Sequence, residues 1–208
     1  MERETIRNLF GKNFIGKDEL KPLFRAMGLG DVEIQEPPVG YSESDLREAA
    51  ESGYILICGV EQAGGQHLTI RFLREKFGID PDVAEPCFYN QDWYLKEDFL
   101  DISLETRWYL VKKDVIEESR AVSPDELISH NVNFPPAILC AYTFFAYYFA
   151  RGEYLWWHDF VWCSDTDHNG DRIYVGKYHD IDGVNKNGFS VHRHLGLRPC
   201  YGSVNYIE

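Results

Sequence analysis

Basic residues are scarce in this sequence. Its 208 residues include 21 lysines and arginines against 34 aspartates and glutamates, which gives a formal net charge of −13. Nucleic acids attract basic surfaces, so this charge argues against direct binding to a phosphate backbone. It remains compatible with a basic partner, and an acidic inhibitor of a nucleic-acid-handling protein is one alternative function.

Signals for export and for membrane insertion are also missing. The chain opens with charged residues rather than a basic segment followed by an apolar run, so we expect no secretory signal. The apolar run over residues 137–150 is shorter than the roughly 20 residues that span a membrane. Because prolines precede this run and Gly152 follows it, it predicts a buried central helix. We therefore expect a cytoplasmic protein without membrane contact.

Catalytic and metal-binding cysteine signatures are absent as well. The five cysteines show no C-x-x-C spacing, and their odd number argues against a disulfide framework, although Cys163 and Cys200 meet if their strands are neighbours. The sequence contains neither a G-x-S-x-G elbow nor an H-E-x-x-H motif. No pattern places a nucleophile beside a base, and we expect a protein without enzymatic activity.

Residues 1–104 predict a small α/β unit. A continuous apolar run over residues 54–60 predicts a strand that is buried on both faces. Helices are expected over residues 17–27, after a cap at Ser42 or Ser44, and over residues 67–77. The glycine loop at Gly64 lacks the lysine and hydroxyl residues of a phosphate-binding loop, which argues against a nucleotide site.

Residues 105–208 predict a second unit that is rich in strands. Residues 107–112 read as a strand, and residues 115–120 and 123–127 as short helices before the buried helix. Strands follow over residues 160–163, 172–178 and 189–195. The Asn169-Gly170 and Asn187-Gly188 pairs between them are strong hairpin signals, so we expect an antiparallel meander.

A strand, helices and a strand-rich end that closes on Gly196-Leu197-Arg198 resemble the C-type-lectin-like fold. The similar form is the bacterial one of formylglycine-generating-enzyme-like and retroelement-diversified variable proteins, which often end in a Gly-Phe-Arg strand. The resemblance covers about residues 105–202 and rests on topology, because the Glu-Pro-Asn and Trp-Asn-Asp sugar signatures are absent. It implies a binding surface on the late strands and loops, near residues 179–194.

Histidine, asparagine and tryptophan side chains gather on the same part of the chain. Residues two apart in a strand share a face, so His192 and His194 should both point outward. Val191 and Leu195, on either side of them, should point inward. Trp156 and Trp157 are adjacent, so one of them should face solvent. The expected ligand-binding face is formed by Trp157, His158, His179, Asn185, Asn187, His192 and His194.

Two metal sites are alternatives on this surface. Asp165, Asp167, Asn169 and Asp171 match the first half of a calcium loop, but Gly176 stands where the bidentate glutamate belongs. A hairpin turn explains the same pattern. His192 and His194 share a strand face and need a third ligand to hold zinc.

Together these patterns predict an α+β protein in which the N-terminal α/β unit packs on a C-type-lectin-like domain with antiparallel strands and a buried central helix. Its expected function is non-enzymatic recognition of a protein or other macromolecular ligand, with no cofactor. A metal-dependent enzyme that uses the C-terminal histidines and residues 165–171 with Ca²⁺ or Zn²⁺ is the other alternative.

Overall fold

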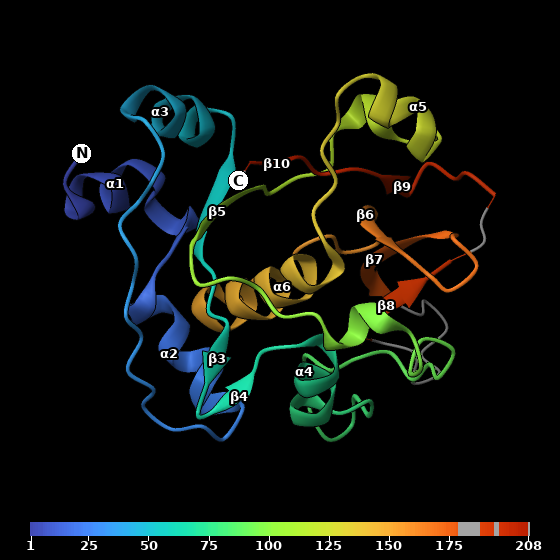
Figure 1. Cartoon of the computed structure of the whole chain (residues 1–208), viewed down its shortest axis with the longest axis horizontal. Helices are drawn as coiled ribbons and strands as arrows, with labels where there is room; N and C mark the ends of the chain where they lie inside the picture. Colours follow the sequence, from blue (N-terminus) through green and yellow to red (C-terminus); the bar gives the residue numbers. More distant parts are fainter. Residues whose placement is uncertain (179–187, 194–195, 208) are drawn as a thin grey trace.

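The computed structural model describes residues 1–178, 188–193 and 196–207. It has an α+β architecture in which a long central helix lies between two four-stranded sheets (Figure 1). The helices of the described residues are α1 (Arg3–Phe10), α2 (Lys17–Ala26), α3 (Glu43–Glu51), α4 (Ile70–Phe77), α5 (Pro124–Ser129) and α6 (Ala137–Arg151), with 3-10 turns η1 (Gly11–Asn13), η2 (Asp98–Asp101) and η3 (Glu117–Ser119).

The first sheet has the strand order β1-β2-β5-β10. β1 runs parallel to β2, and β5 pairs antiparallel with both β2 and β10. Its strands are β1 (Phe14–Ile15), β2 (Tyr54–Cys58), β5 (Trp108–Lys112) and β10 (Tyr206–Ile207). Every residue of β2 is buried, which confirms the strand expected from the apolar run.

The second sheet has the order β8-β7-β6-β9. The three strands β6, β7 and β8 form an antiparallel meander, and β9 lies parallel to β6. These strands are β6 (Phe160–Thr166), β7 (Arg172–Tyr178), β8 (Gly188–His192) and β9 (Tyr201–Gly202). The predicted meander is therefore confirmed, with β8 beginning at the glycine of the expected second turn.

The predicted central helix is also confirmed. α6 is buried over its first three turns, and it packs against α2, α4 and the strands β6 and β7. It ends at Gly152, whose φ of 70° is left-handed, as expected for a glycine that stops a helix. Among the described residues, no helix has both the length and the apolar character that crossing a membrane requires.

Both faces of the second sheet are covered, because successive residues of a strand alternate between them. Val161, Ile173 and Val175 belong to the main core, which also contains α6. Phe160 and Tyr174 belong instead to a second, smaller cluster, which Leu127 of α5 and Phe134 help to cover; its members are Leu127, Phe134, Phe160, Trp162, Tyr174 and Tyr201. The histidine at the end of β8 faces this second cluster rather than open solvent, as shown below.

Two local expectations need correction. Gly64 and Gly65 close a small hairpin of β3 (Gln62–Ala63) and β4 (Gln66–His67), so α4 starts later than expected, after its cap at Thr69. The helix expected over residues 115–120 is only the 3-10 turn η3. In both places a hydrogen-bonded turn replaces a helix suggested by local composition.

The first sheet and the main core both use residues from either side of the expected domain boundary at residue 104. β5 and β10 follow that boundary in the chain, yet they complete the sheet that β1 and β2 begin. The division into 1–104 and 105–208 stays a prediction. All five cysteines are free, and Cys163 lies in the main core, whereas Cys200 packs against the second cluster.

Candidate recognition site

The connection between α6 and β6 presents one tryptophan to solvent. Trp157 is 45% exposed, whereas Trp156 is buried and its indole Nε1 donates a hydrogen bond to the carbonyl oxygen of Lys113 at 3.1 Å. One of the two adjacent rings is therefore buried and the other exposed, as expected. His158, which follows, is exposed, and its ring centroid lies 5.8 Å from that of Trp157.

The backbone on both sides of Trp157 is held in an unfavourable conformation. Trp156 has a φ of 50° and His158 a φ of 67°, in the left-handed region that residues with a Cβ avoid. Each such residue costs on the order of 1 kcal/mol and persists only when the surrounding contacts fix it. The buried indole of Trp156 supplies such a contact, and the consequence is an outward Trp157.

An ion pair of a buried lysine lies beside Trp157. The Lys177 side chain is only 3% exposed, and its Nζ lies 2.6 Å from Oε1 of Glu85, which also accepts a hydrogen bond from the Tyr154 hydroxyl at 2.9 Å. The same Nζ is 4.3 Å from the centre of the Tyr154 ring and 5.9 Å from that of Trp157. Burial, followed by the hydrogen bond to Glu85, raises the pKa of Tyr154. These contacts hold the two rings edge to face, with centroids 5.1 Å apart.

A polar pocket of about 370 Å³ opens beside this tryptophan. Arg120 crosses it and bridges two carboxylates, with its Nε 2.8 Å from Glu117 and its Nη1 2.7 Å from Asp159. Lys113 and Asp114 add further charged groups to the wall. The site therefore joins an exposed aromatic ring to a hollow rich in hydrogen-bond donors and acceptors.

His192 is only partly exposed, contrary to our expectation that it faces solvent. Its ring stacks on Tyr174 at a centroid distance of 5.4 Å and meets Phe160 edge to face at 5.3 Å. Its Nδ1 lies 3.3 Å from the side-chain amide nitrogen of Gln91. Burial lowers the pKa of His192 to about 4. The alternation from Val191 was right, but the second face of the sheet is covered by aromatic residues.

Four further members of the expected face lie outside the described residues. They are His179, Asn185, Asn187 and His194. The described structure thus brings Trp157 and His158 together and places His192 in the second cluster. Tyr154, Lys177 and Glu85 were missed, although a lysine at an inward position of β7 was a signal that a buried partner was required.

The Asp165 and Asp167 carboxylates of the expected calcium loop have different partners. Oδ2 of Asp165 accepts a hydrogen bond from the Ala137 N–H at 2.6 Å, so this carboxylate caps α6. Oδ1 of Asp167 accepts from the N–H groups of Asn169 and Asp171 at 2.8 and 2.9 Å, which is the pattern of an Asx turn. Burial raises the pKa of Asp165, although the hydrogen bond from Ala137 opposes it.

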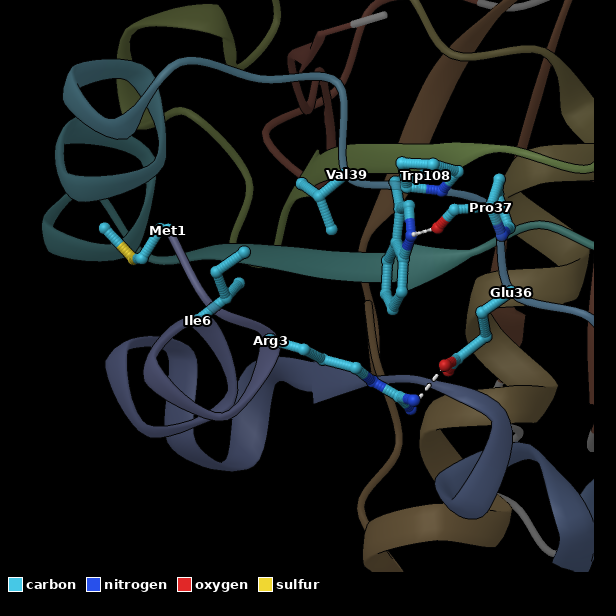
Figure 2. Close-up of a pocket in the computed structure, with 8 residues that line it drawn as sticks. Met1, Arg3, Ile6, Glu36, Pro37, Val39 and Trp108 are labelled. Carbon is cyan, nitrogen blue, oxygen red and sulfur yellow. Dashed lines mark hydrogen bonds and ion pairs between the residues drawn. The ribbon is translucent and has the colours of Figure 1, made fainter.

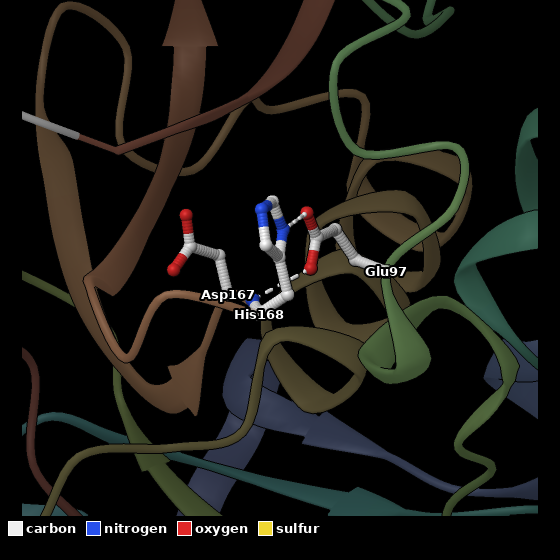
Figure 3. Close-up of side chains that lie close together, drawn as sticks. All are labelled: Glu97, Asp167 and His168. Atoms are coloured by element: carbon white, nitrogen blue, oxygen red, sulfur yellow. Dashed lines mark hydrogen bonds and ion pairs between the residues drawn. The ribbon is translucent and has the colours of Figure 1, made fainter.

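Asp167 also belongs to a compact group with Glu97 and His168 (Figure 3), the cluster of possible metal ligands found among the described residues. Glu97 accepts hydrogen bonds from the backbone N–H of His168 at 2.9 Å and from its Nδ1 at 2.7 Å. Arg193 pairs with Oδ2 of Asp167. Burial opposes ionisation of Asp167, but the hydrogen bonds from Arg193 and the turn amides lower its pKa to about 2. A guanidinium thus already neutralises the charge that would attract a cation.

We expect Ca²⁺, Zn²⁺ and chelators to leave the melting temperature of the protein unchanged. A cation at this cluster would have to displace Arg193 and compete with the hydrogen bonds of Glu97. A site saturated at about 100 times its dissociation constant would instead add about 2.7 kcal/mol of stability. Thermal melts with each ion and with chelator provide the measurement, and an ion-dependent increase that disappears in Asp167→Asn would contradict the prediction.

No protein-family model, no curated protein and no solved structure gives a significant match to the chain.

Proposed function

We propose that the protein is a non-enzymatic recognition module that binds a partner protein, with Trp157 as the central anchor of the interface. The observation that carries the proposal is the exposure of this ring on a strained and supported backbone. Burial of an indole ring removes a large apolar area from water and is favourable. We would therefore expect the ring to turn inward if no partner covered it.

The surroundings of Trp157 fit the usual anatomy of a binding hot spot. Interface hot spots are rich in tryptophan, tyrosine and arginine and are ringed by polar groups that exclude water. Tyr154 and Arg120 lie beside Trp157 at the pocket, with Asp159 on the same wall. Because Lys177 and Glu85 hold the rings in place before binding, little side-chain entropy is lost when a partner docks.

The C-type-lectin-like interpretation of residues 105–202 remains part of this proposal. It is supported by the order of elements, in which β5 is followed by α5, α6 and the strands β6 to β9. Figure 1 shows those late strands on the same side of α6. In that interpretation the partner contacts the late strands and loops, and Trp157 lies at the start of them.

The experiment compares two exposed apolar residues. Trp157 and Ile128 are equally exposed, at 45%, but Ile128 lies on α5 away from the pocket. We expect Trp157→Ala to reduce partner capture by immobilised protein at least tenfold, since a hot-spot truncation costs about 2 kcal/mol or more, and Ile128→Ala to leave it unchanged. The measurement is quantitative mass spectrometry of the captured proteins.

Circular dichroism controls for folding, because substitutions on an exposed surface usually change stability by no more than about 0.5 kcal/mol. If Trp157→Ala is folded and retains the same partners in the same amounts as the parent, this surface is not the interface. A captured set dominated by basic, nucleic-acid-handling proteins would identify the partner class of an acidic inhibitor instead.

A further inference from the structure

A second pocket lies between α1 and the segment that leads to α3 (Figure 2). Its volume is about 410 Å³, within the range of about 300–1,000 Å³ that is usual for small-ligand sites. The walls are mostly apolar, with Ile6 from α1, Val39 from the connecting segment and Trp108 from β5. The indole Nε1 of Trp108 donates to the carbonyl oxygen of Pro37 at 2.9 Å, which fixes this wall.

A buried carboxylate lies at one end of this pocket. The Glu36 side chain is only 7% exposed, and its Oε1 accepts a hydrogen bond from the backbone N–H of Lys17, the first residue of α2. A negative charge is favourable there, because the N-terminus of a helix carries positive partial charge. A Cβ atom added at Gly16 would lie 2.6 Å from this oxygen, so the glycine makes room for the close approach.

The second oxygen, Oε2, is buried and is reached by the guanidinium of Arg3. Figure 2 shows the two side chains directed toward each other across the pocket. The Arg3 side chain is 42% exposed, and within the described part of the chain its ion pair is with Glu36. The arginine therefore occupies the acidic end of the pocket from an accessible position on α1 and has little else to hold it.

We propose that this pocket is a binding site for an alkylguanidinium or alkylammonium group, and that Arg3 occupies the site in cis. The carboxylate of Glu36 supplies the charge, and Ile6, Val39 and Trp108 contact the apolar part of the ligand. Ligand binding requires Arg3 to leave Oε2, so the two cations compete. The site is separate from the surface around Trp157 and does not depend on the function proposed for it.

Removal of the internal competitor provides the test. In Arg3→Ala the carboxylate loses its counter-charge, and we expect n-butylguanidine to bind at least tenfold more tightly than it binds the parent protein. The neutral isostere n-butylurea has the same shape and should not bind measurably. The double variant Arg3→Ala/Glu36→Gln should lose the gain in affinity. Isothermal titration calorimetry measures all three.

Arg3→Met is a second variant in case Arg3→Ala does not fold, since it keeps an apolar side chain against the wall and removes only the charge. The parent protein supplies an independent measurement, because saturating n-butylguanidine should shift the indole resonance of Trp108 and n-butylurea should not.

The tripeptide Ac-Gly-Arg-Gly-NH2 distinguishes the source of the cation. Tighter binding than n-butylguanidine assigns the site to a peptide arginine, and weaker binding assigns it to a small molecule.

The proposal is overturned if n-butylguanidine binds the parent and Arg3→Ala equally, or if its binding survives Glu36→Gln. Equal binding of n-butylguanidine and n-butylurea would also overturn it, because the pocket would then recognise shape without charge.

Discussion

Phe145→Ala should lower the free energy of unfolding by about 3–5 kcal/mol, the usual range for removal of a buried phenylalanine ring. Phe145 is fully buried on α6. Its ring stacks on Phe77 of α4 at a centroid distance of 4.4 Å and on Phe88 at 5.1 Å, and it lies 6.1 Å from Phe189 of β8. The substitution leaves a cavity where three parts of the chain meet, so the surrounding structure has little freedom to fill it.

Phe149→Ala is the matched control one turn later on the same helix. Phe149 also stacks on Phe77, at 5.4 Å, but it is only partly buried. We expect Phe149→Ala to lower the free energy of unfolding clearly less than Phe145→Ala does. Urea unfolding measures both losses, provided that the dependence on urea concentration is the same in the two variants. A loss for Phe145→Ala no greater than that for Phe149→Ala would remove α6 from the centre of the fold.

The contribution of His192 to stability should fall by roughly 3 kcal/mol as the pH drops from 6.5 to 4, because its half-buried ring is kept neutral in the folded protein. Burial lowers the pKa of His192 from 6.5 to about 4. Between these values the unfolded chain binds a proton that the folded protein excludes, at about 1.4 kcal/mol per pH unit. The contribution is therefore complete above pH 6.5 and is lost on acidification.

His192→Phe separates this effect from other titrations. A phenyl ring can keep the stacking on Tyr174 but cannot take up a proton, so the variant should lose most of the pH dependence between 6.5 and 4. His67→Gln, at an exposed histidine, should retain it. Urea unfolding at a series of pH values is the measurement, and parallel curves for the parent and His192→Phe would show that His192 is not the titrating group.

The elements that the sequence predicts well are those whose pattern is local. The apolar residues 137–150 between proline and glycine correspond to α6, and the Asn169-Gly170 pair lies at the turn between β6 and β7. Residues 115–120 have a composition that suits a helix, and that prediction was wrong. The N–H of Ile116 is instead hydrogen-bonded to Ser203, near the other end of the chain. Such a long-range bond leaves no mark on the local sequence.

The candidate site shows the same division. One exposed ring of the Trp156-Trp157 pair was predicted, but the left-handed backbone that presents it was not. The ion pair between Lys177 and Glu85 joins residues far apart in the sequence, and nothing near either residue identifies its partner. The partial burial of His192 depends in the same way on Phe160 of β6 and Tyr174 of β7.

Photo-crosslinking from position 157 tests the proposed recognition surface most directly. We would replace Trp157 with the photoreactive aromatic residue p-benzoylphenylalanine, and Ile128, which is equally exposed, with the same residue as the control. We predict covalent capture of a partner protein from position 157 and background capture from position 128. Equal crosslinking from the two positions, with both proteins folded, would contradict the assignment of Trp157 as the anchor of the interface.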